Sequence, residues 1–327
     1  MRNHWLMAAV ALVLVQATGV YAQQNYPNRP VRLIVPFAPG GGADITARML
    51  AQKLTESFKQ TVIVDNRPGG GGTIGIETAV KAAPDGYTLI LLTTGYTTNA
   101  ALNKLPYDAV NDVAPIGLVG ETGFVVVVHP SLPVKSIKEL IAYDKASPGK
   151  INYGSAGTGG ITHIATEFLN YMTGTKMTHV SYKGGGPALT DLLGGQIQLV
   201  LIAPTPSIPL MKANRLRGIA ITSAKRSNAL PDIPTVSESI PGYEAVLWFG
   251  VLGPKALPKD IVARWNKEID RIVQLPDVKE RMANDGTEAI GGSPERFREV
   301  LARDIAKYQK VVKAANIKTG SREFGLS

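Results

Sequence analysis

Short runs of apolar and often β-branched residues alternate along this chain with longer stretches of helical spacing. The runs are Val31–Val35, Thr61–Val64, Thr88–Leu92, Phe124–Val128, Ile197–Ile202 and Leu216–Ile221. Several of them are apolar at every position, which is typical of parallel strands that are covered on both faces. The alternation predicts an α/β fold built on parallel sheets.

Helix starts can be recognised between these runs. Residues 44–58 carry apolar side chains at helical spacing. Ser136 stands three residues before Glu139, which is the pattern of a capping box. Ser293 precedes a proline and predicts the N-cap of a helix that continues to about residue 315.

The length of the chain predicts two lobes. At about 100–200 residues per domain, 327 residues suggest two domains rather than one very large sheet. Two extended apolar segments, 114–126 and 245–253, bracket the middle of the chain. We therefore expect residues 23–120 with 250–327 to form one lobe and residues 121–249 the other, with a ligand in the cleft between them.

The N-terminal segment has the features of a secretory signal peptide over residues 1–22. Its apolar run is Leu6–Val15, and small side chains precede a cleavage site after Ala22, with Gln23 as the new start. The run is shorter than the ~20 residues of a spanning helix. We expect export to the periplasm, and we expect the polar tail 319–327 to be frayed or foreign to the fold.

Composition and motifs argue against most enzymes. The chain has no cysteine, which excludes disulfides, thiolate metal sites and cysteine nucleophiles. Its net charge of +9 comes from scattered Lys and Arg, which makes nucleic acid a poor partner. His163 and Glu167 are spaced as metal ligands but lack a third partner, and Tyr153 stands where a nucleophile elbow around Ser155 would need glycine. We expect binding without catalysis, and no cofactor or metal.

Four glycine-rich loops lie where predicted strands give way to predicted helices. They are Pro36–Asp44, Asn66–Gly75, Gly154–Gly160 and Tyr182–Pro187. Glycine lets backbone N–H groups approach a ligand, and a helix N-terminus adds about half a positive charge. Two such loops facing each other across a cleft would suit a ligand with a carboxylate at one or both ends.

Individual residues of these loops allow more than one interpretation. The second loop contains G-x-G-x-x-G, but no acid follows the strand at 88–92, so a dinucleotide site is not expected. We favour Asp44 as a helix cap over a ligand contact, and His163 as a packing or hydrogen-bonding residue over a ligand contact. Lys183 could supply charge to the site or belong to the solvated surface.

The ordered series of motifs resembles the substrate-binding receptors of tripartite tricarboxylate transporters, also called the Bug family. The resemblance extends from Tyr26 to Lys318. The motifs are Pro36–Gly41 with Asp44 and Arg48, Asn66–Gly69, Pro84–Thr88, Gly154–Gly159 with His163, Tyr182–Gly184 with Pro187, Lys225–Ser227, Pro231–Asp232 and Pro234–Thr235.

This resemblance implies a type II periplasmic binding protein fold, whose two lobes close on a small carboxylate. The residues implied to bind the ligand are Phe37, Ala38, Gly41, Gly42, Thr93, Thr94, Tyr96, Ser155, Gly157, Thr158, Gly159, His163, Tyr182, Lys183 and Ala203.

One position departs from the pattern of many members of that family. They carry an acid after the strand that corresponds to residues 197–201, whereas this chain has Ile202 followed by Ala203. An acid there would complement an ammonium group, and burying an unpaired ammonium costs several kcal/mol. The departure argues against amino-acid ligands and towards an uncharged, aromatic or aliphatic middle section.

The sequence thus predicts a monomeric periplasmic receptor. It would capture a di- or tricarboxylate, or an aromatic carboxylate, for a membrane permease of the tripartite type. Two alternatives stay open at this point. One is a ligand-sensing protein for a signalling partner, and the other is an exported α/β hydrolase that uses Ser155.

Overall fold

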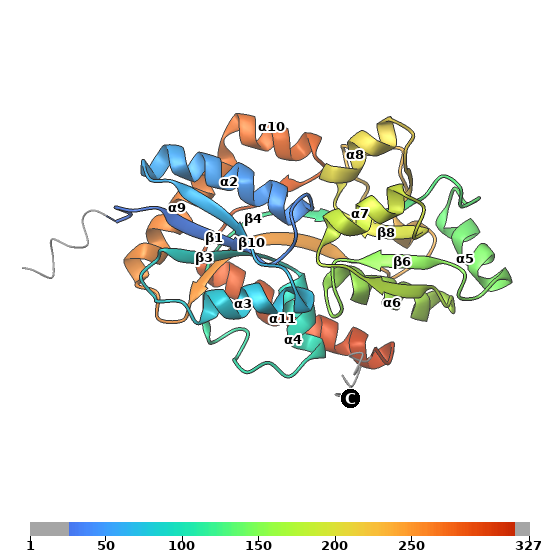
Figure 1. Cartoon of the computed structure of the whole chain (residues 1–327), viewed down its shortest axis with the longest axis horizontal. Helices are drawn as coiled ribbons and strands as arrows, with labels where there is room; N and C mark the ends of the chain where they lie inside the picture. Colours follow the sequence, from blue (N-terminus) through green and yellow to red (C-terminus); the bar gives the residue numbers. More distant parts are fainter. Residues whose placement is uncertain (1–25, 318–327) are drawn as a thin grey trace, which may run out of the picture.

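Two β-sheets, each with helices on both faces, form the two lobes of the chain, which confirms the predicted α/β two-lobe class (Figure 1). The structure is a computed structural model and describes residues 26–317. The predicted signal peptide, the predicted start at Gln23 and the tail 319–327 lie outside the described residues.

The first sheet has the strand order β11-β4-β10-β3-β1-β2. Its strands are β1 (Val31–Val35), β2 (Val62–Asn66), β3 (Thr88–Thr93), β4 (Val113–Gly123), β10 (Val246–Pro254) and β11 (Glu288–Ala289). The second sheet has the order β7-β6-β8-β5-β9. Its strands are β5 (Val125–Val128), β6 (Asn152–Ser155), β7 (Thr178–Ser181), β8 (Leu199–Ile202) and β9 (Arg217–Ile221).

Both sheets are mixed, so the expectation of parallel sheets holds only for part of each. β1 runs parallel to β2 and β3, and β6 runs parallel to β7 and β8. In the first sheet β10 is antiparallel to β3 and β4, and in the second β5 is antiparallel to β8 and β9. The chain enters the second lobe through β5 and returns to the first lobe through β10, so in each lobe an antiparallel strand carries the chain in from the other lobe.

Helices cover both faces of the first sheet because its central strands are apolar on both sides. Leu33 faces α2 and α9, whereas the adjacent Ile34 faces α3, α4 and α11. The helices of this lobe are α2 (Gly42–Phe58), α3 (Thr73–Val80), α4 (Gly95–Leu102), α9 (Lys259–Gln274), α10 (Pro276–Asn284) and α11 (Pro294–Ala314), with a short 3-10 turn at Gly70–Gly72. The predicted helix of residues 44–58 is confirmed.

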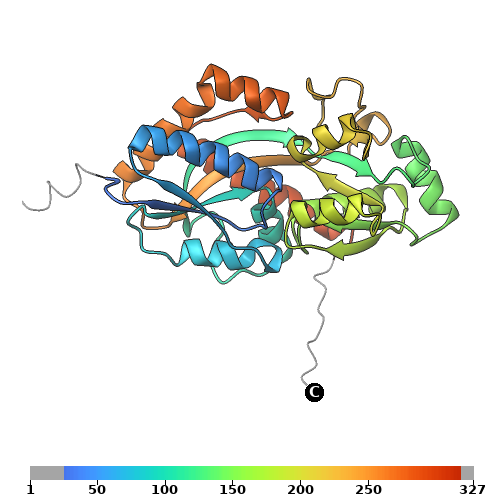
Figure 2. The same cartoon turned by 45° about the horizontal axis from the view of Figure 1, so that its top comes forward.

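The second sheet is sandwiched in the same way (Figure 2). Val126 and Val128 face α5 and α6, and Val125 and Val127 face α7, as expected from the period of two in a strand. The helices are α5 (Ile137–Ala146), α6 (Ile161–Thr173), α7 (Gly185–Leu193) and α8 (Pro204–Lys212), with a 3-10 turn at Val236–Glu238.

The N-cap bonds at Ser136 and Ser293 are present. The Ser136 hydroxyl accepts the Glu139 N–H at 3.2 Å at the start of α5, but the Glu139 carboxylate accepts the Lys135 N–H at 2.7 Å instead of the Ser136 N–H, so only half of the predicted capping box forms. The Ser293 hydroxyl accepts the Arg296 N–H at 3.3 Å at the start of α11. These two helices start away from the sheet ends where the glycine-rich loops lie.

The two chain crossings between the lobes are tied together by one threonine. The Thr222 hydroxyl accepts the Phe124 N–H at 2.8 Å and donates to the Ala245 carbonyl at 2.6 Å. The predicted boundaries at residues 121 and 249 fall inside β4 and β10. We propose lobe boundaries at Phe124 and Ala245 instead, because the strands on either side of each belong to different sheets.

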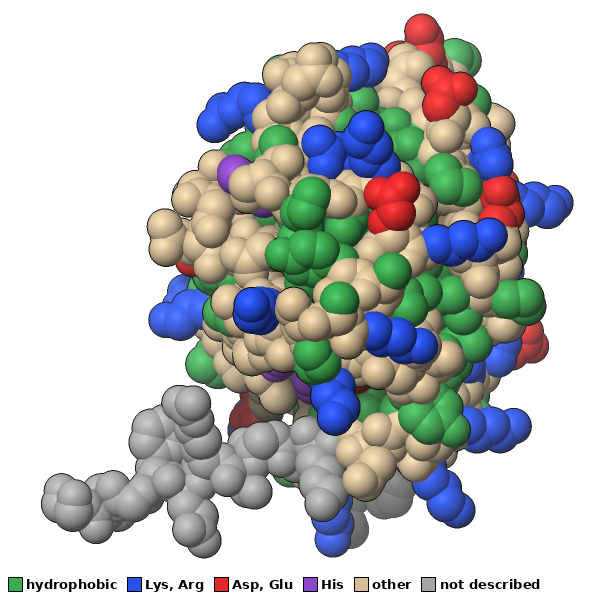
Figure 3. All heavy atoms as spheres, turned by 90° about the vertical axis from the view of Figure 1, so that its right-hand side faces the viewer, with side chains coloured by type: hydrophobic (Ala, Val, Ile, Leu, Met, Phe, Trp, Pro, Cys, Tyr) green, Lys and Arg blue, Asp and Glu red, His purple; other side chains and the backbone are tan. Residues whose placement is uncertain are grey.

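Lys and Arg are spread over the face in Figure 3, with Asp and Glu among them. Within residues 26–317, no helix combines the length and the apolar character that a membrane crossing requires.

Candidate functional site

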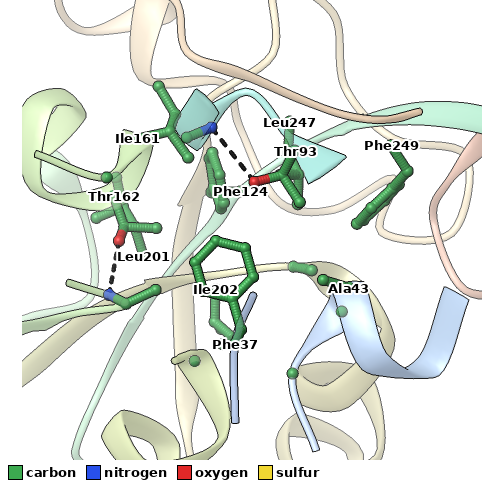
Figure 4. A pocket seen from close by; sticks show the side chains of 17 residues that line it. Phe37, Ala43, Thr93, Phe124, Ile161, Thr162, Leu201, Ile202, Leu247 and Phe249 are labelled. Atoms are coloured by element: carbon green, nitrogen blue, oxygen red, sulfur yellow. Dashed lines mark hydrogen bonds between the residues drawn. The ribbon is translucent and has the colours of Figure 1, made fainter. Parts of the chain in front are cut away.

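A small cavity of about 60 Å³ lies between the two lobes, where the starts of several helices meet (Figure 4). The first lobe and its crossings contribute Phe37, Gly41, Gly42, Ala43, Thr93, Gly95, Leu247 and Phe249. The second lobe contributes Ala156, Gly160, Ile161, Thr162, Gly185, Leu201, Ile202 and Ala203, and Phe124 lies on the crossing.

Four helices begin at this cavity without a capping side chain. The N-cap residues of α2, α4, α6 and α7 are Gly41, Thr94, Gly160 and Gly184, and none of them makes a side-chain cap. The first N–H groups of a helix have no partner within the helix. Here they face the cavity, where the positive ends of the helix dipoles favour an anion.

Apolar side chains form the walls between these helix starts. Figure 4 shows the rings of Phe37, Phe124 and Phe249 around the cavity, with Leu201 and Ile202 beside them. Among the described residues that line the cavity, none carries a charge. The site can therefore bind an anion through backbone N–H groups, and it offers no carboxylate to an ammonium group.

The hydroxyls that line the cavity are engaged with the backbone. Thr93 Oγ1 accepts the Gly95 N–H at 3.3 Å, and Thr162 Oγ1 accepts the Ala156 N–H at 3.0 Å. Both bonds are drawn in Figure 4. Each hydroxyl fixes the turn before a helix and leaves its own hydrogen free for a ligand or for the backbone.

The first glycine-rich loop is held by an ionic network around Asp44. Asp44 Oδ2 accepts the Gly40 N–H at 3.1 Å, and the same carboxylate pairs with Arg48 and with the Asn66 amide. Burial alone would raise the pKa of Asp44, but the hydrogen bonds from Arg48, Gly40 and Asn66 lower it. The prediction that Asp44 is the N-cap residue is wrong, because Gly41 is the N-cap and Asp44 lies in the first turn.

In the glycine-rich loop at residues 154–160, the chain itself occupies the N–H groups of residues 156–160. Four of these N–H groups donate to side chains at 3.0–3.2 Å, namely those of Ala156, Gly157, Thr158 and Gly159. The Gly160 N–H donates to the Gly157 carbonyl. The accepting side chains are Thr162, Ser155, Ser181 and His163. The amides open to a ligand are therefore those in the first turn of α6, after the loop.

Behind this loop, the buried Ser155 and His163 lie beside the partly buried His179. Ser155 Oγ lies 2.6 Å from His179 Nε2, and the His163 and His179 rings stack with centroids 4.1 Å apart. Burial lowers the pKa of His163 to about 3, with a further contribution from His179, and burial lowers that of His179 to about 4. Both rings are neutral at pH 7.

The lobes are in contact around the cavity, so the structure is a closed arrangement. The Ala38 N–H donates to the Lys183 carbonyl at 2.8 Å, and Thr98 Oγ1 donates to the Gly159 carbonyl at 2.9 Å. On one rim the backbones of Gly71 and Gly157 are so close that a Cβ on Gly157 would lie 2.8 Å from Gly71 Cα.

Five of the predicted ligand residues line the cavity, namely Phe37, Gly41, Gly42, Thr93 and Ala203. The other ten lie behind or beside it. They are Ala38, Thr94, Tyr96, Ser155, Gly157, Thr158, Gly159, His163, Tyr182 and Lys183.

Several of these ten residues have structural bonds of their own. The Tyr96 hydroxyl donates to the Ala109 carbonyl, and Thr94 Oγ1 bonds to the backbone of β10. The Tyr182 hydroxyl donates to Asp191, and Lys183 is exposed while its carbonyl joins the lobes. Ser155 is fully buried, and its Oγ bonds to the Gly157 N–H and to His179.

The sequence did not identify the residues that supply most of the wall. Leu247 and Phe249 come from one crossing, Phe124 from the other, and Ile161 from the start of α6. The available signal was the position of Ile161 and Thr162 directly after a glycine-rich loop, where first-turn amides are expected.

Comparisons with known proteins identify relatives of the chain. A family model described as "Tripartite tricarboxylate transporter family receptor" matches residues 46–317. Protein BugT of Bordetella pertussis (strain Tohama I) is 34% identical over 323 residues, which cover 97% of this chain and 99% of that protein.

Solved structures resemble the chain over most of its length. The structure of Rhodopseudomonas palustris Rpa4515 with adipate matches at a TM-score of 0.86 and 35% identity, over 90% of this chain and 99% of that one. The structure of R. palustris MatC with bound malate matches at 0.84 and 28%, over 88% and 100%.

Proposed function

Since this chain belongs to the receptor family of tripartite tricarboxylate transporters, the Bug proteins, we propose that it captures a small organic carboxylate between its lobes for uptake by a membrane permease. One observation carries the proposal. The uncapped first turns of α2 in one lobe and of α6 in the other face the same closed cavity. A carboxylate there would receive N–H groups from both lobes.

The mechanism is a shift between open and closed lobes. A ligand that contacts both lobes binds the closed form more tightly and therefore increases its population. The bond from Thr98 to Gly159 and the bond from Ala38 to Lys183 exist only when the lobes meet. The closed form would be the form that the permease recognises.

The walls of the cavity favour a carboxylate with an uncharged body. Three phenylalanine rings and the side chains of Leu201 and Ile202 would contact the part of the ligand between or beyond its charged ends. Both adipate in Rpa4515 and malate in MatC are dicarboxylates without an ammonium group. The cavity holds roughly four waters at ~15 Å³ each, so a long ligand would hold the lobes further apart than they are here.

A thermal-shift screen tests the proposal. The panel contains butyrate, benzoate, succinate, malate, adipate and citrate, with the matched pair glutarate and glutamate to isolate the effect of the ammonium group. A ligand at a hundredfold excess over its Kd should stabilise the protein by ~2.7 kcal/mol. We expect at least one carboxylate to do so and glutarate to exceed glutamate. A flat response to the whole panel would contradict the proposal.

Export belongs to the same proposal. One similar structure is described as a periplasmic transporter and another as the periplasmic binding protein BugD, and cleavage after Ala22 would release the chain into the periplasm. The mass of the protein recovered from a periplasmic extract should correspond to a chain that starts at Gln23. A mass that includes residues 1–22 would show that the segment is retained.

A further inference from the structure

The starting point is a group of side chains that does not line the cavity. Ser155 at the end of β6 and His163 in the first turn of α6 are buried behind the loop at residues 154–160, and the partly buried His179 lies beside them on β7. None of the three lines the cavity. Their bonds to the loop backbone suggest another role.

His163 determines the direction of one peptide group. Its Nδ1 lies 3.2 Å from the Gly159 nitrogen, and a backbone N–H can only donate. Nδ1 must therefore be the acceptor, and the ring must carry its proton on Nε2. The carbonyl of the same residue, Gly159, accepts the hydroxyl of Thr98 from the other lobe.

Ser155 and His179 act on the neighbouring peptide. The Gly157 N–H donates to Ser155 Oγ at 3.2 Å, and Ser155 Oγ in turn shares a hydrogen with His179 Nε2 at 2.6 Å. Gly157 has φ near +138° and contacts Gly71 of the first lobe. The stack of the two rings, with Tyr153 on the far side of His179, fixes both imidazoles in place.

We propose that His163 and His179 are positioning residues for ligand capture: with Ser155, they hold the loop of residues 156–160 in the shape that meets the first lobe and aims the first turn of α6 at the cavity. This inference rests on the function proposed above. The loop would otherwise be free to rotate, because glycines at 157, 159 and 160 restrict the backbone little. A loop that is fixed in advance loses less entropy when the ligand binds.

The wild-type protein provides the first test. The ¹⁵N chemical shifts of the His163 ring should show an unprotonated Nδ1 and a protonated Nε2 at pH 7. Protonation at Nδ1 would overturn the proposal, because that ring could not accept the Gly159 N–H. This measurement needs neither a variant nor a ligand.

Two variants of one residue provide the second test. His163→Leu removes the acceptor, whereas His163→Asn keeps an oxygen close to the position of Nδ1, and His129→Asn is the matched control outside the cluster. We expect His163→Leu to speed amide exchange at Gly159 about tenfold and to weaken binding about tenfold, and His163→Asn to stay within about threefold of the wild type. Equal behaviour of the Leu and Asn variants, or no effect of either, would overturn the proposal.

The probes for binding are adipate, malate and benzoate. If the wild-type protein binds none of them, the proposed function fails for these classes, but the exchange rates in the absence of ligand still decide the present inference. If His163→Leu does not fold, Ser155→Ala replaces it, with faster amide exchange at Gly157 as the expected result. Unchanged exchange at Gly157 in Ser155→Ala would overturn the proposal.

Discussion

The loops that precede α2 and α6 lie on opposite sides of the cavity, and each holds the start of a helix that faces it. Different side chains hold the two loops in place. Each follows a strand, each is rich in glycine, and each leads into a helix whose first turn faces the cavity. The loop at residues 36–44 is held by an ionised carboxylate, Asp44, with Arg48 and Asn66 around it. The loop at residues 154–160 is held by uncharged hydroxyls and imidazoles.

The difference reflects where the two supports lie. Arg48 is exposed, so a charge pair with Asp44 is only partly removed from water. His163 is buried and His179 is partly buried, and burial disfavours a charge on either ring, so neutral groups hold the loop there. A helix start that faces an anion site can therefore be held in place by an ion pair or by neutral hydrogen-bonding groups. The stabilisation from these two kinds of group should be lost under different conditions.

Acid separates the two supports. A histidine whose folded pKa is lowered takes up a proton more readily when unfolded, so stability falls as pH drops from about 6.5 towards the folded value of about 3 for His163. Asp44 has a lowered pKa, so its contribution is complete above its ordinary value of 3.8 and is lost only below it. Between pH 6.5 and 4, only the support of the loop at residues 154–160 should weaken.

The largest expected effect is the loss of affinity on adding a methyl group to Gly157, compared with the same addition to Gly41 in the other loop. Gly157→Ala places a Cβ 2.8 Å from Gly71 Cα at a φ of +138°, so the lobes cannot close as they do here. We expect a loss of at least about 3 kcal/mol, or roughly 100-fold in affinity. Gly41→Ala meets neighbours no closer than 3.6 Å at a φ of −87° and should change affinity less than about threefold.

Isothermal titration with the best carboxylate of the panel measures both variants. Equal losses in Gly157→Ala and Gly41→Ala would mean that the loops are not closed against each other in the way described. Circular dichroism at pH 7 checks that both variants are folded.

The second effect is the loss of stability in mild acid. From the pKa of about 3 for His163, protonation of the unfolded chain should lower the free energy of unfolding by about 2 kcal/mol at pH 5 relative to pH 8. Urea titrations at a series of pH values measure this slope. His163→Asn should make the slope shallower but leave the part that comes from His179, whose pKa is lowered to about 4, and His129→Asn should leave the slope unchanged. A slope in His163→Asn as steep as in the wild type would contradict the assignment.

The third effect concerns the ionic support. Asp44→Asn keeps an oxygen for the Gly40 N–H but loses the charge that faces Arg48, and we expect a loss of about 1.5 kcal/mol at pH 7. The difference from the wild type should persist to pH 5 and shrink below about pH 4. Glu77→Gln, which breaks the exposed pair with Lys81, is the control and should cost less than about 0.5 kcal/mol.

The smallest effect tests the bond between the lobes. Thr98→Val removes the hydroxyl that reaches Gly159, and we expect ligand affinity to fall about fivefold, from the loss of about 1 kcal/mol. Thr97→Val removes a buried hydroxyl that bonds only within its own helix, to the Thr94 carbonyl. It should lower stability without changing affinity, so equal affinities for the two variants would exclude the bond to Gly159 as a contributor to closure.

Much of the fold could be predicted from the sequence because burial on both faces makes strands such as β1 and β8 apolar at nearly every position. β6 and β7 escaped prediction because Asn152–Ser155 and Thr178–Ser181 contain no apolar run. The reversed direction of β5 and β10 depends on how the chain crosses between lobes, which no local pattern records.

The place of the site was predictable, and its chemistry less so. Glycines before α2 and α6 pointed to the right helix starts, because close backbone approaches need them. Which amides stay free depends on Ser155, Ser181 and His163, which come from three different elements. Phe124 and Phe249 face one cavity although they are far apart in the chain, so only the tertiary structure could assign them to it.

A crystal structure with a bound carboxylate from the panel tests the central claim most directly. The account predicts a carboxylate oxygen within hydrogen-bond distance of first-turn N–H groups of α2, at Gly42 or Ala43, or of α6, at Ile161 or Thr162. It also predicts that the amides of residues 156–159 keep their side-chain partners. A ligand outside the cavity, or one bound by those loop amides in place of Thr162, Ser155, Ser181 and His163, would contradict it.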